Sequence, residues 1–203
     1  MFQTFSPQKT FREFLDWKPE KGRFELHNGV IVEMQLTGKH EQVAGFLAME
    51  LTWEFRKLKL PYFIPNQALV KIPGKESGYF PDVLLVNTDA LWQESLWEKH
   101  STLQNGNSIP LVVEVVSTNW RDDYFYKAGD YEAIGIPEYW IVDYLALGGK
   151  RFIGNPKQPT ISVYHLIDEE YQITQYQGSQ KIISPTFPEL NLTANQVFEH
   201  RIH

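Results

Sequence analysis

The sequence predicts an α/β (α+β) protein with additional β-hairpins. Three observations support this prediction: short apolar runs that are typical of buried strands, longer segments with helical periodicity, and two segments that alternate around turn residues. The chain has 203 residues, of which 42% are apolar, so it is long enough to bury a full hydrophobic core. No repeat, linker or low-complexity tract divides it, and we therefore expect a single domain over residues 1–203.

The composition excludes several classes of protein. The chain has no cysteine, which rules out disulfides, cysteine-based zinc sites and thiol catalysis, and which mildly favours a cytoplasmic location. We expect no signal peptide at Met1–Lys9 and no membrane span, because no apolar run approaches the roughly 18–20 residues that a spanning helix needs. The formal net charge of −6 argues against tight non-specific binding to nucleic acid, although it allows a local basic surface.

Local signals define the N-terminal region. Thr10–Trp17 predicts a short helix, with Thr10 as N-cap and Glu13 at the capping-box position. Arg23–Met34 predicts a β-hairpin around Asn-Gly at positions 28 and 29, the pair best suited to a type I′ turn. The hairpin is either a lid or the opening strands of the sheet.

Gly38–Lys59 is the longest helical pattern. Its apolar stripe consists of Val43, Leu47, Leu51, Phe55 and Leu58. His40 projects onto the centre of this stripe and Glu54 lies close to it. A single histidine on an apolar face is more often a hydrogen-bonded core residue than an active-site residue, and both interpretations stay open. A helical zinc-protease motif is excluded, because its second histidine would stand at position 44, which is Ala44.

The next hundred residues contain two strongly apolar strand patterns. Tyr62–Ile72 is rich in β-formers, and the loop at 73–78 lacks the ending of a phosphate-binding P-loop. Phe80–Val86 then predicts a buried strand with Asp82 at its start, a position where an aspartate is more often a turn or edge residue. Asp89–Gly106 predicts a loop or short helix that covers one edge.

Leu111–Ser117 predicts a strand that is buried on both faces. Glu114 stands in its middle, among valine and leucine residues. A carboxylate in such a run is costly unless a cation, a metal ion or a strong donor meets it. A structural ion pair, or a strand whose glutamate face is wet, would also explain the pattern.

Arg121–Ala133 predicts a helix that returns over the sheet and stops at Gly135. Tyr124, Lys127, Ala128 and Tyr131 share one face of it, so Lys127 lies on the side that should meet the strands. Lysines usually extend from such faces to solvent. This one is placed so that it can serve as the cation for Glu114.

The C-terminal third supplies the remaining strands. Glu138–Asp143 predicts a third buried strand, with Asp143 at its end. Ile161–Ile167 and Tyr171–Tyr176 alternate and form a second hairpin. A proline-interrupted connection over 184–192 and a closing helical turn over 195–200 complete the chain.

The candidate catalytic residues are Asp82, Glu114 and Lys127. Two carboxylates from neighbouring strands suit a hard cation such as Mg²⁺ or Mn²⁺, which keeps waters in its other coordination positions. Such an ion can lower the pKa of a bound water and polarise a phosphoryl oxygen. A nearby lysine can orient or deprotonate the attacking water, or stabilise the transition state.

The chain resembles a known family in the order and spacing of several blocks. These blocks are Phe24-Glu25-Leu26, Asn28-Gly29, Met34, His40, Pro81-Asp82, Glu114 within Val-Val-Glu-Val-Val-Ser, Lys127, Tyr131, Gly135 and Glu138–Asp143. They are similar to those of the Uma-two family of restriction endonucleases, which belongs to the PD-(D/E)XK nuclease superfamily. The likeness covers nearly the whole chain. It implies a restriction-endonuclease-like core, a mixed β-sheet flanked by helices, in which Asp82 and Glu114 bind the metal ion and the carbonyl of Val115 completes its site.

One position departs from the superfamily pattern. The lysine expected two residues after the glutamate is replaced by Val116. The resemblance implies that Lys127 on the following helix takes its place, and the helical periodicity indicates the same residue independently.

Two functions from different classes follow. The first is a Mg²⁺-dependent (or Mn²⁺-dependent) DNA endonuclease, with Asp82 and Glu114 as metal ligands and Lys127 assisting catalysis; a homodimer would place two sites on two strands. The second is a catalytically inert nuclease-fold module that binds a protein or nucleic acid, favoured by Val116 and the acidic net charge. A small-molecule metal-dependent hydrolase is a weaker third. Contributions of Glu25, His40 and Asp143 to the site are left open.

Overall fold

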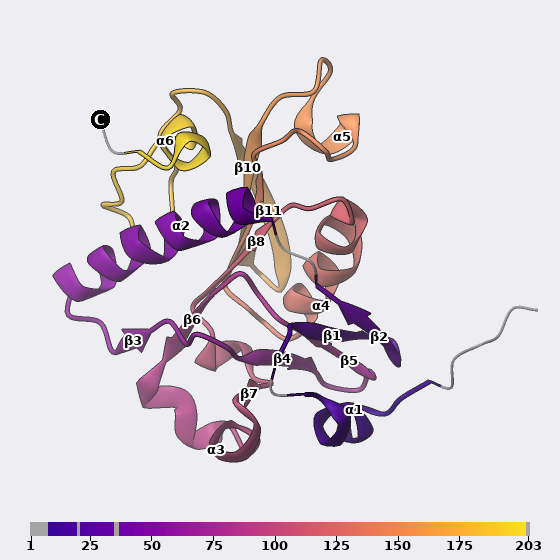
Figure 1. Cartoon of the computed structure of the whole chain (residues 1–203). Helices are drawn as coiled ribbons and strands as arrows, with labels where there is room; N and C mark the ends of the chain where they lie inside the picture. Colours follow the sequence, from indigo (N-terminus) through magenta and orange to yellow (C-terminus); the bar gives the residue numbers. More distant parts are fainter. Residues whose placement is uncertain (1–7, 20, 35–36, 202–203) are drawn as a thin grey trace, which may run out of the picture.

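The computed structural model describes residues 8–19, 21–34 and 37–201, and two mixed β-sheets form the centre of this part of the chain (Figure 1). The larger sheet has the order β11-β10-β9-β8-β6-β3 and the smaller sheet the order β2-β1-β5-β4-β7. One pair in each sheet is parallel, β8 with β9 and β4 with β7. The strands are β1 Phe24–His27, β2 Val30–Glu33, β3 Tyr62–Phe63, β4 Leu69–Ile72, β5 Ser77–Tyr79, β6 Val83–Asn87, β7 Thr102–Leu103, β8 Leu111–Val115, β9 Glu138–Asp143, β10 Thr160–Ile167 and β11 Glu170–Tyr176.

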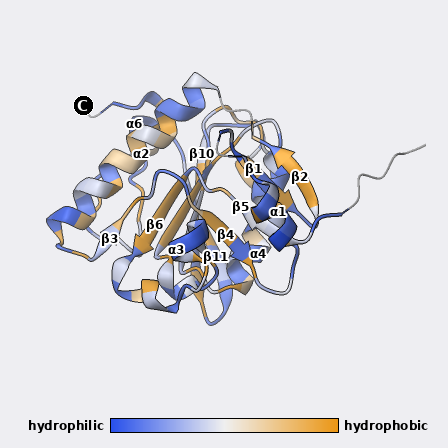
Figure 2. Cartoon of the chain, turned by 60° about the horizontal axis from the view of Figure 1, so that its bottom comes forward, coloured by the Kyte–Doolittle hydropathy of each residue, from blue (hydrophilic) through white to orange (hydrophobic). Residues whose placement is uncertain are grey.

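Helices flank both sheets, which confirms the predicted fold class. The helical segments are α1 Phe11–Trp17, α2 Gly38–Lys57, η1 Thr88–Gln93, α3 Trp97–His100, η2 Gly106–Ser108, η3 Asp122–Lys127, α4 Ala128–Ala133, α5 Lys150–Ile153 and α6 Ala194–Glu199. In Figure 2 the strand β6 is coloured as hydrophobic, whereas α1 and α3 at the surface are mostly hydrophilic. No helix within the described ranges is both long and apolar enough to cross a membrane.

The helix and the hairpin predicted in the N-terminal region are confirmed. Thr10 caps α1 and exchanges both hydrogen bonds of a capping box with Glu13. Strands β1 and β2 pair around Asn28 and Gly29, whose φ angles of 47° and 83° are those of a type I′ turn. The hairpin is part of a sheet, because β1 also pairs with β5. It opens the smaller sheet, separate from the one that contains β8.

The central strand β8 divides the core into two layers. All five of its residues are buried, as predicted. Because side chains alternate along a strand, Val113 and Val115 pack against α2 and α6, while Val112 faces the other layer. That other layer contains η3, α4 and the inner side of the smaller sheet, and Figure 1 shows these elements across the larger sheet from α2. Glu114 is two residues from Val112, so the two side chains point to the same face of β8. The carboxylate of Glu114 therefore lies between the two sheets.

The structure corrects one element that bears on the site. The segment expected to be a regular α-helix from Arg121 is instead π-helical over Asp122–Lys127 and α-helical over Ala128–Ala133. The face inferred from α-helical spacing is nevertheless buried, including Tyr124, Lys127 and Tyr131. Single π-helical turns are rare and often lie at functional sites, since they shift side chains relative to the regular helical stripe.

Smaller differences concern boundaries. Helix α2 ends at Lys57, and the strand expected from Phe80 begins at Val83, which leaves Asp82 immediately before it. The β-rich region 62–72 splits into β3 and β4, and the region 89–106 contains η1, α3 and β7. The strands β9, β10 and β11 and the closing helix α6 lie where the sequence predicted them.

Candidate active site

Asp82 is bound to the backbone of the central strand. It lies just before β6, and its Oδ2 accepts a hydrogen bond of 2.8 Å from the Val115 N–H. Its side chain is almost completely buried, and its Oδ1 has no hydrogen-bond partner within the described residues. Arg23 Nη2 lies 3.5 Å from that oxygen and donates to the carbonyls of Phe80 and Pro81. Asp82 is therefore held by a hydrogen bond through Oδ2, while Oδ1 has, among the described residues, only the ion pair with Arg23.

Glu114 is buried between the two sheets and bound on both oxygens. Tyr131 OH donates to Oε1 at 2.8 Å, and Lys127 Nζ lies 3.1 Å from Oε2. Burial raises the pKa of Glu114 well above its usual value; Lys127 opposes this, and the neighbouring carboxylate of Asp82 adds to it. The cation that the sequence required for this carboxylate is present.

Lys127 is the centre of the group. Its side chain is only 2% exposed, and its Nζ lies 3.1 Å from both Glu114 and Glu25 and 3.5 Å from Asp123. Burial alone would lower the pKa of Lys127, but these carboxylates raise it well above the usual value, so the ammonium is charged. The expected proximity to Glu114 is confirmed. Asp82 acts on Lys127 electrostatically, without an ion pair to it among the described contacts.

Glu25 joins the group from the smaller sheet. Its Oε1 accepts from Phe80 N–H at 2.8 Å and from Lys127, and its Oε2 accepts from His27 Nε2 at 2.7 Å. Burial would raise the pKa of Glu25, but Lys127 and His27 outweigh it and hold the pKa at about 2. Glu25 therefore carries a negative charge that faces the Lys127 ammonium, and it lies in the candidate site.

Asp123 is a site residue that the sequence analysis did not single out. It lies in the first turn of η3, where Tyr139 OH donates to its backbone carbonyl at 3.1 Å. Burial, together with the carboxylates of Asp82 and Glu25, raises the pKa of Asp123 to about 7 in spite of Lys127. The available signal was its spacing of four residues from Lys127, which on most helices indicates an ordinary surface ion pair.

His40 reaches the site from the start of α2. It is buried, and its Nε2 lies 2.8 Å from the Val115 carbonyl oxygen, to which it donates, and 3.2 Å from Asp82 Oδ2. Burial disfavours the charged ring, but the hydrogen bond to Asp82 outweighs it, and the pKa of His40 is raised. His40 is thus both a buried residue of the α2 stripe and a neighbour of the candidate site.

Asp143 has a different role. Its two carboxylate oxygens accept from the N–H groups of Leu147 and Gly148, at 2.9 and 2.7 Å. These bonds fix the turn that follows β9, which is a sufficient structural reason for a carboxylate at this position.

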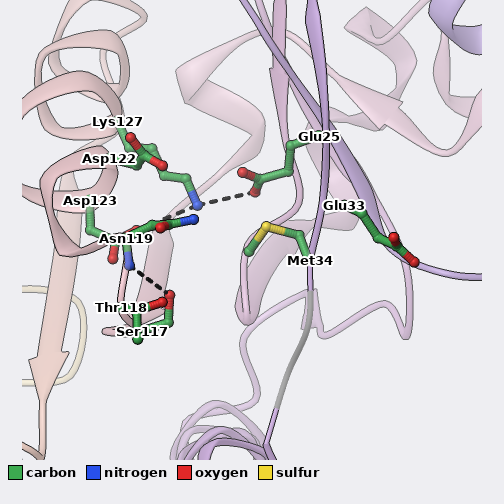
Figure 3. Close-up of a pocket in the computed structure, with 9 residues that line it drawn as sticks. All are labelled: Glu25, Glu33, Met34, Ser117, Thr118, Asn119, Asp122, Asp123 and Lys127. Atoms are coloured by element: carbon green, nitrogen blue, oxygen red, sulfur yellow. Dashed lines mark hydrogen bonds and ion pairs between the residues drawn. The ribbon is translucent and has the colours of Figure 1, made fainter.

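A pocket of about 190 Å³ opens beside these groups. Figure 3 shows Lys127 and Glu25 facing one another across it, with the loop after β8 on one side and the end of β2 on the other. The lining residues are Glu25, Glu33, Met34, Ser117, Thr118, Asn119, Asp122, Asp123 and Lys127. The buried ion cluster therefore has a route to solvent along its Lys127 side.

The residues suit a divalent cation only in a restricted way. Within the described part of the chain, no group of three or more His, Asp or Glu side chains is arranged to hold a metal ion. Asp82 nevertheless offers a buried oxygen that has no hydrogen-bond partner among the described residues, and its carboxylate is close enough to Glu114 to help raise the pKa of Glu114. The Val115 carbonyl accepts from His40 and keeps one lone pair. Mg²⁺ is commonly bound by one or two carboxylates with waters in its other positions, and this donor set fits such an ion.

Comparison with known proteins shows the family of the chain and its fold. A mixed sheet in which a buried aspartate, glutamate and lysine gather beside a pocket is the arrangement expected of a restriction-endonuclease-like protein. The chain belongs to the Uma2 family, described as "Putative restriction endonuclease", whose family model matches residues 11–195. A solved structure from Anabaena variabilis ATCC 29413, titled as a putative nuclease belonging to DUF820, has a similar fold. Its TM-score is 0.71 at 15% identity, over 94% of this chain and 97% of that one. No curated protein matches the chain by sequence.

Proposed function

We propose that this protein is a Mg²⁺- or Mn²⁺-dependent DNA endonuclease that hydrolyses phosphodiester bonds with a metal-activated water. The observation that carries the proposal is the buried ammonium of Lys127, which contacts Glu114, Glu25 and Asp123 beside a pocket. A purely structural protein has little reason to bury this many charges, because their desolvation costs more than an apolar core of the same volume.

Asp82 and Glu114 would hold the metal ion, with the Val115 carbonyl as a third oxygen. The ion would supply an activated water and neutralise charge on the phosphoryl oxygens. Asp82 would contribute Oδ1, which accepts no hydrogen bond from the described residues, while the bond from Val115 N–H to Oδ2 fixes the direction of the carboxylate. His40 donates to the Val115 carbonyl and so orients it.

Lys127 would act on the substrate side of the site. Its ammonium lies at the pocket and can bind a phosphate oxygen or orient the attacking water. Glu25 and Asp123 hold the ammonium from two further directions, which reduces the number of positions that it can adopt. Glu25 is a positioning residue in this proposal, because it acts through Lys127.

The same contacts bear on domain organisation. Glu25 comes from the smaller sheet and Glu114 from the larger one, and both bind Lys127. We therefore treat residues 1–203 as one domain in which neither sheet makes the site alone. A cytoplasmic location suits a chain without cysteine, and a homodimer would bring two sites to the two strands of DNA.

Calorimetric titration with Mn²⁺ and Mg²⁺ tests the proposed site. We expect the wild-type protein to bind one ion at millimolar or lower concentration, and Asp82→Ala to weaken that binding by at least about tenfold. Asp143→Ala is a suitable control, since Asp143 is a buried carboxylate whose two oxygens bind N–H groups of a local turn. Wild-type protein that releases no heat with either metal would overturn the proposal.

That negative result would favour the second candidate, an inert nuclease-fold module. The specific observation in its favour is that Glu114 is already bound by Lys127 and Tyr131 on its two oxygens. The absence of a lysine at position 116 points the same way. In such a module the ion cluster would only join the two sheets.

A further inference from the structure

Aromatic and arginine side chains gather around Trp120, which directly follows the pocket-lining residues 117–119. We call the set Trp120, Arg121, Phe125, Arg151 and Phe152 the aromatic–arginine surface. The ring of Phe152 lies 6.2 Å from that of Trp120 and 5.2 Å from that of Phe125, centroid to centroid. The guanidinium of Arg121 lies 4.4 Å from the Trp120 ring, and that of Arg151 lies 4.7 and 4.4 Å from the rings of Phe125 and Phe152.

This surface is exposed to solvent and packs on the core. Phe125 is 44% exposed and its neighbour Tyr126 is 57% exposed, and both arginines are exposed. Beneath them, Phe152 stacks on the buried Tyr124 at 4.6 Å. The rings are thus held by the core on one side and open to solvent on the other.

The surface continues directly from the candidate active site. The loop after β8 lines the pocket with Ser117, Thr118 and Asn119, and the next two residues are Trp120 and Arg121. Helix η3 then returns to the pocket with Asp122 and Asp123. Figure 1 shows α5, which carries Arg151, on the same side of the molecule as α4. A polymer strand that leaves the pocket past this loop would cross the surface at once.

The charge of the surface is opposite to that of the protein. The chain has a net charge of −6, yet Arg121, Lys150 and Arg151 are all exposed here. The acidic side chain nearest to Arg121 along the loop is that of Asp122, which is half-buried at the edge of the pocket. Cations interleaved with exposed aromatic rings match a chain that alternates phosphates and flat bases.

We propose that the aromatic–arginine surface binds unpaired nucleotides of a nucleic-acid strand whose neighbouring phosphodiester enters the pocket. Arg121 and Arg151 bind phosphates, and Phe125, assisted by Tyr126, stacks on a base. An aromatic ring needs an open base face, which a regular duplex does not offer, so the surface favours a single-stranded or splayed segment. This inference rests on the proposed nuclease function and specifies the form of its substrate.

Fluorescence anisotropy with labelled oligonucleotides tests the proposal. The measurement uses the full chain in EDTA, so that cleavage does not interfere, and compares a thymidine oligonucleotide, its RNA counterpart and a hairpin duplex. We expect the single strand to bind more tightly than the duplex. Phe125→Ala/Arg151→Ala should weaken single-strand binding at least about tenfold, through lost stacking and one lost phosphate contact. The slope of log K against log salt should fall by about 0.7.

The matched control removes another exposed aromatic–arginine pair, which lies elsewhere on the molecule. Trp53 is 70% exposed on α2, close in sequence to the exposed Arg56, and Trp53→Ala/Arg56→Ala should bind as the wild type does. Equal binding by both double variants, preference for the duplex, or no binding by the wild type would each overturn the proposal. Circular dichroism of each variant confirms that the fold is intact.

Failure of this inference and failure of the proposed function are distinguishable. Normal metal-dependent cleavage with unchanged oligonucleotide binding in Phe125→Ala/Arg151→Ala would support the nuclease function and reject the aromatic–arginine surface as a binding site. Single-strand binding that depends on the surface, in a protein that cleaves no nucleic acid, would support the binding surface and reject the nuclease function. Binding restricted to the RNA strand would keep the surface and reject DNA as its partner.

Discussion

Lys127→Met should abolish metal-dependent nucleic-acid cleavage, with a loss of at least about a thousandfold. The expected size follows from removing a single charge-stabilising or proton-handling group from a buried site, which typically costs 10²–10⁴ in rate. Lys127→Arg should not restore activity. Its guanidinium cannot act as a base, and it is too large for a space in which Nζ contacts Glu25 and Glu114 at 3.1 Å.

The same substitution should also cost stability. Lys127→Met leaves Glu25, Glu114 and Asp123 buried together without their shared cation, and an uncompensated buried charge costs about 3–5 kcal/mol. Protonation lowers that cost, because the pKa of Glu114 and that of Asp123 are already raised by burial. We therefore expect a folded protein whose midpoint of unfolding in urea is lower than that of the wild type. Cleavage has to be measured below that midpoint, where the variant is folded.

Two further variants separate chemistry from stability. Lys75→Met removes another lysine that is paired with a buried carboxylate, Asp130, away from the pocket. It should lose stability without a comparable loss of cleavage. Val116→Lys in the Lys127→Met background places an ammonium on the Glu114 side of β8, where it should recover part of the activity. Full cleavage by Lys127→Met would refute the assignment of Lys127.

Glu25→Gln should lower cleavage by about a hundredfold while the protein stays folded. Glutamine can still accept from the Phe80 N–H, but it removes the negative charge that faces Lys127 and His27. The ammonium then has two carboxylate partners in place of three, so it is held less firmly. Removing the side chain entirely, in Glu25→Ala, should destabilise the protein by about 3 kcal/mol.

The matched control for Glu25 lies on the next strand. Glu33 lines the same pocket from β2 but is exposed, and Glu33→Gln should change cleavage no more than twofold. Single-turnover rates with saturating metal provide the measurement. Equal rates for Glu25→Gln and the wild type would show that Lys127 needs no support from the smaller sheet.

Local rules explain which elements could be predicted from the sequence. The capping box of α1 and the type I′ turn depend on a few adjacent residues, so Thr10 and the Asn28-Gly29 pair were sufficient. The buried strand β8 was predicted because its apolar run is continuous. Lys127 was found because a lysine on a helical face that must be buried needs a partner.

The remainder of the site depends on how distant elements pack. Glu25 lies in a hairpin that could have been a lid, and only the packing of the smaller sheet against η3 brings it to Lys127. Asp123 stands four residues before Lys127, the spacing of a common ion pair on a helix surface. Its burial could therefore not be predicted from the neighbouring residues. The π-helical turn has no sequence signature of its own, and the hydrogen-bond partner of His40 is a backbone carbonyl, which carries no residue identity.

A cleavage assay on supercoiled and single-stranded DNA tests the central claim most directly. Purified wild-type protein should cut DNA with Mg²⁺ or Mn²⁺, and EDTA should stop the reaction. Asp82→Ala and Lys127→Met, at the same concentration and with the fold confirmed, should produce no cut above background. Cleavage that persists in EDTA or in these two variants, or a wild type that cuts nothing with either metal, would contradict the proposal that Asp82, Glu114 and Lys127 form the active site of a metal-dependent nuclease.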